Sequence, residues 1–166
     1  MGRAKAVQAE EAARRAGQGD AALLAKIRAV PGCEALTWDD VQLASTIFAV
    51  KPGDGSAREQ AASCQRVLGG AANFACEYAT KRYRSNCINW GMLPFLVENP
   101  GALDNGDYVY LPGVRKALLN ADDELTAIAV KPDGGVVRFT VSLGAMTDAE
   151  RQILADGCLI NYYKNH

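Results

Sequence analysis

The sequence predicts an α/β domain built on a mixed β-sheet, and three patterns support this fold class. Short apolar runs alternate with helix-forming runs through the middle of the chain, as strands joined by crossover helices do. Pro132-Asp133-Gly134-Gly135 then separates two alternating segments, which is a strong hairpin signal. Thr147-Asp148-Ala149-Glu150 has the spacing of a capping box and predicts a helix near the end of the chain.

The first part of the chain is rich in alanine and predicts helices rather than strands. Helices are expected at 4–16 and 20–29, with glycines between them and a proline soon after the second. Thr37 or Asp39 is a suitable start for a short helix that runs to Leu43.

The rest of the chain switches between segments with the hydrophobic pattern of a strand and segments with that of a helix. It contains no internal repeat and no clear linker. The segments expected to be extended before the hairpin are 46–50, 72–78, 93–97 and 108–111. The helices expected in this part are 56–68, 81–89, 148–156 and a helical continuation at 159–163. Because crossover helices and a hairpin occur together, the sheet should contain both parallel and antiparallel strands.

Length and composition describe one compact domain of ordinary globular character. The chain has 166 residues, of which 49% are hydrophobic and 22% are charged, with a net charge of -1. This charge gives no electrostatic basis for nucleic-acid binding, and no apolar run approaches the length of a membrane span. The N-terminus mixes acidic and basic residues with alanine, unlike a signal or transit peptide. We therefore expect a cytoplasmic protein that does not bind nucleic acid.

Ser56-Ala57-Arg58-Glu59 is the candidate functional motif. It follows Lys51-Pro52-Gly53-Asp54-Gly55, at the point where a strand should give way to a helix. Free backbone N–H groups and the helix dipole favour an anion at such a point, and Arg58 adds a planar donor fork that suits a carboxylate. The same spacing also fits a structural capping box, with Ser56 as the N-cap and Glu59 reaching back to its backbone.

These residues resemble the C-terminal swivel domain of the aconitase family, over about Ile47 to Leu96. The motifs that match, in order, are Gly55-Ser56-Ala57-Arg58-Glu59-Gln60-Ala61-Ala62, Leu68-Gly69-Gly70, Arg84-Ser85-Asn86 and Gly91-Met92-Leu93-Pro94-Phe95. Two features depart from the family pattern. Ala57 stands where the family usually has a second serine, and the residues before about Thr46 match poorly.

The resemblance implies the family's swivelling three-layer β/β/α fold and a hydro-lyase activity on a hydroxy-carboxylic acid. In the family, a serine alkoxide from this domain removes a proton, and a 4Fe–4S cluster held by other domains is the Lewis acid for the departing hydroxide. Ser56 corresponds to the base and Arg58 to a ligand of the substrate carboxylate, with Gly55 and Ala57 contributing backbone. The cluster is thus expected in complementary domains or a large subunit, and this chain is expected to bind no cofactor and to be inactive alone.

The cysteines do not suggest a metal site on this chain. There are five of them, and no two form a C-x-x-C pair: Cys33, Cys64, Cys76, Cys87 and Cys158. An odd number without a secretion signal also argues against a disulfide framework. The only histidine is His166, so activation of a serine by histidine within the chain is not expected either.

Two questions stay open at the level of sequence. Because Ala57 lacks a hydroxyl, a non-catalytic module that binds carboxylate or phosphate is the alternative to the hydro-lyase. The domain is expected at 46–166, preceded by a helical segment at 1–45. That segment is either the truncated start of the domain or part of a natural small subunit, as in isopropylmalate isomerase.

Overall fold

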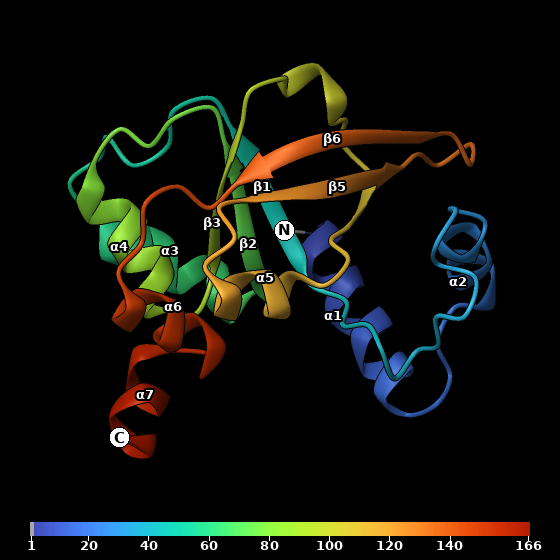
Figure 1. The fold of residues 1–166 in the computed structure, drawn as a ribbon, viewed down its shortest axis with the longest axis horizontal. Coiled ribbons are helices and arrows are strands. Elements are labelled where there is room, and N and C mark those ends of the chain that lie inside the picture. The colour runs from blue at the N-terminus through green and yellow to red at the C-terminus, as the bar shows by residue number, and fades with distance from the viewer. Residues whose placement is uncertain (1) are drawn as a thin grey trace.

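The computed structural model describes residues 2–166 and confirms an α/β domain with a mixed sheet (Figure 1). The strands are β1 (Ser45–Ala49), β2 (Gly70–Ala75), β3 (Leu93–Val97), β4 (Tyr108–Tyr110), β5 (Glu124–Val130) and β6 (Val136–Ser142). The helices are α1 (Gly2–Arg15), α2 (Ala21–Arg28), α3 (Arg58–Val67), α4 (Lys81–Asn89), α5 (Val114–Asn120), α6 (Asp148–Ala155) and α7 (Leu159–Asn165), with a short 3-10 turn, η1 (Pro100–Ala102). The swivel architecture implied by the resemblance stays a prediction.

The strands of the described residues form one six-stranded sheet in the order β1-β2-β3-β6-β5-β4. β1, β2 and β3 run parallel, and α3 and α4 connect them as crossover helices. β6, β5 and β4 are antiparallel to their neighbours. The predicted hairpin is confirmed, since the Lys131 N–H donates to the Gly135 carbonyl at 2.8 Å in the turn between β5 and β6. The predicted capping box is also confirmed, with Thr147 as the N-cap of α6.

Two predicted elements differ from the structure, and one helix of the structure was not predicted. The helix from Thr37 or Asp39 to Leu43 is wrong, because the Asp40 carboxylate accepts the Thr37 backbone N–H at 2.8 Å and closes a turn there. The second strand ends at Ala75 instead of continuing to 78, since the next two backbone N–H groups turn to the Val50 carbonyl. Helix α5 has no counterpart among the predicted elements.

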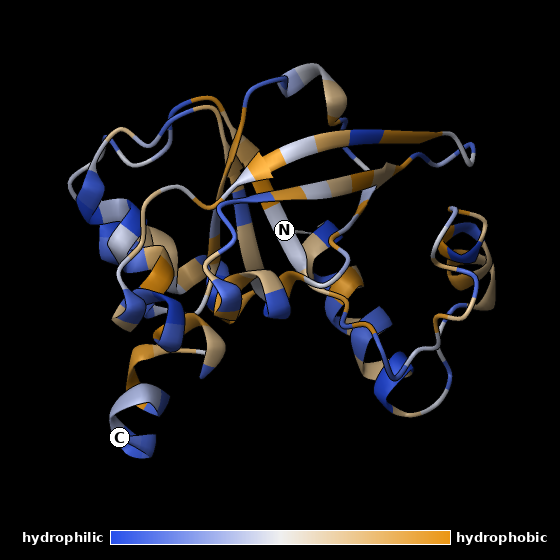
Figure 2. Ribbon diagram, in the orientation of Figure 1, coloured by the Kyte–Doolittle hydropathy of each residue, from blue (hydrophilic) through white to orange (hydrophobic). Residues whose placement is uncertain are grey.

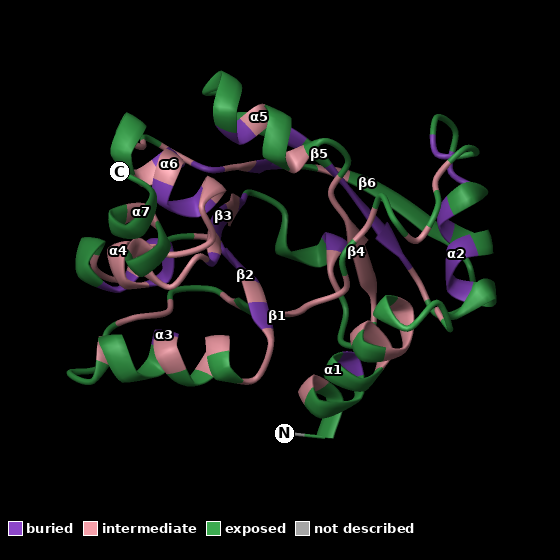
Figure 3. Cartoon of the chain, turned by 90° about the horizontal axis from the view of Figure 1, so that it is seen from below, coloured by how far each residue is buried: buried purple, intermediate pink, exposed green. Residues whose placement is uncertain are grey.

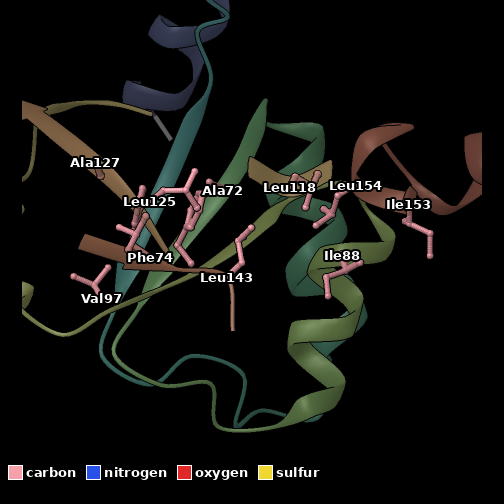
Figure 4. Close-up of a cluster of buried hydrophobic side chains, with 12 residues drawn as sticks. Ala72, Phe74, Ile88, Val97, Leu118, Leu125, Ala127, Leu143, Ile153 and Leu154 are labelled. Atoms are coloured by element: carbon pink, nitrogen blue, oxygen red, sulfur yellow. The ribbon is translucent and has the colours of Figure 1, made fainter. Parts of the chain in front are cut away.

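The main core lies between the sheet and helices α4, α5 and α6 (Figure 4). Phe74 of β2 and Phe95 of β3 stack with their ring centroids 5.3 Å apart, and both side chains are buried. Ile88, Leu118 and Leu154 bring the three helices onto this cluster. Figure 2 shows hydrophobic residues gathered in the strands, whereas hydrophilic and apolar residues alternate along α1.

A second cluster covers the opposite face of β5. Leu125 and Ala127 point into the main core, so Ile128, one residue out of step, faces the other way. Leu23 and Ile27 of α2 pack against Ile128 in this second cluster. The first helices therefore pack on strands of the predicted 46–166 region. Met1, the first residue of the predicted 1–45 segment, lies outside the described residues.

Two tight turns meet by their backbones on the helical side of the molecule. Gly91, between α4 and β3, has φ +72°, and a Cβ atom built on it would overlap the carbonyl oxygen of Gly157. Gly157 lies in the turn between α6 and α7. Only a residue without a side chain allows this approach, so Gly91 fixes how the last two helices sit against β3.

Candidate functional site

The candidate site lies beyond the carboxyl ends of the parallel strands, where the loops after β1 and β2 run side by side (Figure 1). The Val50 carbonyl accepts hydrogen bonds from the N–H groups of Cys76 and Glu77, each at 3.1 Å. The Pro52 carbonyl accepts one from Ala79 at 2.9 Å. Ligands of open α/β sheets commonly bind at this edge, in the crevice outside the strand ends.

Ser56 is exposed in the loop after β1 and does not cap a helix. Helix α3 begins at Arg58, and its N-cap is Ala57, which has φ -89° and ψ 50° and no side-chain capping bond. The capping-box interpretation of Ser56 is therefore wrong. The N-cap lies one residue later than the capping-box spacing predicted, which puts the Ser56 hydroxyl one residue ahead of it, outside the first helical turn.

The structural-cap role predicted for Glu59 is wrong for the same reason. Its carboxylate instead accepts a hydrogen bond from the indole Nε1–H of Trp90 at 3.0 Å. Trp90 is the C-cap of α4, so this bond ties the start of α3 to the end of α4. Figure 3 shows α3 exposed along much of its length at the margin of the molecule. A tie to α4 at this point therefore helps to fix the first turn of α3, next to Ser56.

Arg58 folds back over the loop that precedes it. Its Nε–H donates to the Gly53 carbonyl at 3.0 Å, and an Nη2–H makes a longer bond of 3.4 Å to the Asp54 carbonyl. A guanidinium has five donors, so the remaining three are available to a ligand. Gly55 and Ala57, both exposed, are the neighbours of Ser56 in the chain, and Arg58 follows Ala57. Ser56, Gly55, Ala57 and Arg58 thus share one short turn at a helix N-terminus, an arrangement that suits an anion.

Sequence reasoning missed the residues that support this turn from α4. Gly53 has φ +95°, and a Cβ atom on it would lie 2.5 Å from Cβ of Tyr83. The Thr80 hydroxyl donates to the Gly53 carbonyl at 3.0 Å and accepts the Tyr83 backbone N–H at 3.2 Å. A threonine directly before the helix predicted at 81–89 is a recognisable N-cap, but its contact with residue 53 is not visible in the sequence.

A buried polar cluster lies beneath Tyr83. Asn73, fully buried on β2, donates to the Tyr83 hydroxyl at 3.1 Å and to the Cys87 sulfur at 3.4 Å, and its side-chain oxygen accepts from Gln65. Burial raises the pKa of Cys87 to about 11, although hydrogen bonds from Tyr83 and Asn73 oppose the shift. Burial also raises the pKa of Tyr83 to about 12, and the charge of an ionised Cys87 adds to that shift. Both groups are therefore neutral at physiological pH and act as packing and hydrogen-bonding residues.

The raised pKa of Cys87 predicts a loss of stability in alkali. The thiol ionises near its ordinary pKa of 9.0 in the unfolded chain and near about 11 in the folded chain. Between these values the unfolded state binds fewer protons than the folded state, so the free energy of unfolding falls as the pH rises, by about 2–3 kcal/mol from this group. Urea unfolding across this pH window should show the decline, and Cys87→Ala should make it shallower, with the remainder coming from Tyr83, whose pKa is also raised. The exposed Cys64→Ala serves as the matched control, and an unchanged slope in Cys87→Ala would refute the assignment.

The described residues offer no ligand set for a metal ion. Within 2–166, no three His, Cys, Asp or Glu side chains gather closely enough to hold one. The five cysteines are free thiols, and only Cys33 and Cys87 are buried. Residues 2–166 also include no helix long and apolar enough to cross a membrane.

Comparison of the chain with protein-family models and with curated proteins finds no match. The resemblance to the aconitase family therefore depends only on the sequence motifs between Gly55 and Phe95, and membership of the family stays a prediction.

Proposed function

We propose that this chain is the swivel domain of an aconitase-like hydro-lyase, which dehydrates and rehydrates a hydroxy-carboxylic acid. The observation that carries the proposal is the turn at the start of α3, where an exposed Ser56 precedes an Arg58 whose outer donors are free. The chain would act with cluster-bearing domains or a large subunit, in the cytoplasm, and supply the proton-transfer and carboxylate-binding groups.

In this proposal, Arg58 holds a substrate carboxylate by its two Nη groups. Ser56 Oγ, as an alkoxide, removes the proton from the carbon beside that carboxylate. A serine anion is a useful base only if it is stabilised, and the free N–H groups of the first turn of α3 and the nearby guanidinium provide this. The cluster of the partner domains would supply the Lewis acid for the departing hydroxide.

A second candidate is a binding module without catalysis, and Ala57 favours it. Alanine keeps the backbone N–H but offers no hydroxyl to a ligand. Such a module would use the same turn and the same Arg58 for a carboxylate or a phosphate, with Ser56 as a bystander.

Calorimetry on the 166-residue chain tests the part that the two candidates share. We expect the chain to bind a tricarboxylate such as citrate, Arg58→Ala to abolish this binding, and Ser56→Ala to change the Kd by less than about threefold, since a neutral hydroxyl adds little to a charge-assisted pair. Arg82→Ala, an exposed arginine on α4, is the control for nonspecific charge. Equal losses in Arg58→Ala and Arg82→Ala would contradict the site.

A further inference from the structure

The Gly53 carbonyl accepts two hydrogen bonds from different elements. One comes from Arg58 Nε–H at the start of α3, and the other from the Thr80 hydroxyl at the start of α4, each at 3.0 Å. A carbonyl oxygen has two lone pairs, so both donors can be accepted at once. The Gly53 carbonyl therefore links α4 to Arg58, so that α4 can set the position of the arginine side chain.

The direction of this carbonyl is fixed on the α4 side. Only glycine fits against the buried Tyr83 at position 53, and because the backbone of glycine is the most flexible, the Thr80 hydroxyl is needed to hold the carbonyl. Thr80 is held in turn, because its hydroxyl oxygen also accepts the Tyr83 backbone N–H as the N-cap of α4. The chain of contacts from α4 to Arg58 thus contains no exposed, freely rotating link before the arginine itself.

We propose that Thr80 is a positioning residue for Arg58, acting through the Gly53 carbonyl. By anchoring this carbonyl, the Thr80 hydroxyl holds Arg58 by its Nε edge and leaves Nη1 and the second N–H of Nη2 for bidentate binding of a carboxylate. The last step depends on the proposed function, whereas the ordering of the Arg58 side chain does not. A guanidinium that is ordered before binding loses less conformational entropy when the ligand arrives.

The test compares Thr80→Val, which keeps the shape and removes the hydroxyl, with Thr80→Ser, which keeps the hydroxyl. Thr147→Val is the matched control, because Thr147 is the N-cap of α6. Removing its hydroxyl weakens a threonine-capped helix that is not the one at the candidate site. Two quantities are measured on the 166-residue chain at a temperature where every variant is folded. They are the hydrogen exchange of the Arg58 Nε–H by nitrogen-15 NMR, and the Kd for citrate by calorimetry.

We expect Thr80→Val to speed exchange of the Arg58 Nε–H to the rate of the exposed Arg82, and to raise the Kd about tenfold, the size of one hydrogen bond. Thr80→Ser and Thr147→Val should stay near wild type in both quantities. In an Arg58→Lys background, Thr80→Val should add little further loss, since lysine has no Nε–H for the Gly53 carbonyl to hold.

Three outcomes overturn the inference. They are an unchanged exchange rate in Thr80→Val, equal effects of Thr80→Val and Thr147→Val, and a full additional loss of affinity in the Arg58→Lys background. If Thr80→Val speeds the exchange but the wild-type chain binds no citrate, Thr80 orders Arg58 as inferred and the proposed carboxylate function is the part that fails.

Discussion

In the proposed hydro-lyase, replacing Ser56 with alanine is expected to lower turnover of the complete, cluster-loaded enzyme by at least about a hundredfold, while the free energy of unfolding changes by less than about 0.5 kcal/mol. The two expectations separate cleanly because the hydroxyl is exposed and does not cap α3. Loss of a residue that is needed for stability would lower both the turnover and the free energy of unfolding. Loss of a positioned base lowers only the turnover.

The control for this experiment is Ser63→Ala, on the helix that follows Ser56, where the hydroxyl donates to the Gln60 carbonyl within α3. Turnover should be unaffected there. The proposal requires the hydroxyl of Ser56 as the base. Ser56→Asp should therefore be as inactive as the alanine variant, because aspartate is too weak a base and would repel the carboxylate bound at Arg58. Turnover within about threefold of wild type in Ser56→Ala would leave the binding module as the better proposal.

The largest effect on stability is expected from Gly91→Ala. The new methyl group would occupy the place of the Gly157 carbonyl oxygen, and the neighbouring atoms are backbone that cannot rotate away. The left-handed φ of +72° adds strain of its own to any residue with a Cβ. Together these predict a loss of about 3–5 kcal/mol in the free energy of unfolding, measured by urea denaturation.

Gly17→Ala is the matched control, because Gly17 has a similar φ of +75° and nothing within 4 Å of the Cβ position. It should lose only the conformational part, about 1 kcal/mol. Equal losses in the two variants would mean that the contact with Gly157 contributes nothing, and that the turns between α4 and β3 and between α6 and α7 do not need to touch.

The elements that were predictable are those whose signals are local. The parallel strands and crossover helices of 46–97 carry clear hydrophobic runs and glycine stops, and the hairpin turn is fixed by its own four residues. Helix α5 was missed because it lacks such signals. Its N-cap is Gly113 without a side-chain bond, and its C-cap is Ala121, a non-glycine residue at φ +62°.

The candidate site shows the same limit at the scale of single residues. The spacing of Ser56 and Glu59 suited a capping box, but it could not say where the loop would end and the helix begin. That choice is made by non-local contacts, namely the bond of Glu59 to Trp90 and the packing of Gly53 on Tyr83. The position of the turn before α3 was therefore predictable from the sequence, whereas the hydrogen bonds that its side chains make were not.

The seam between β3 and β6 divides the sheet into a parallel and an antiparallel part, and only two residue pairs join them, against seven between β5 and β6. The parts are coupled mainly by apolar side chains of the main core, such as Phe95 and Val141. Apolar contacts weaken on cooling, unlike the hydrogen-bonded ladders on either side. The coupling of the two parts therefore depends largely on the burial of apolar side chains, and we expect it to weaken on cooling.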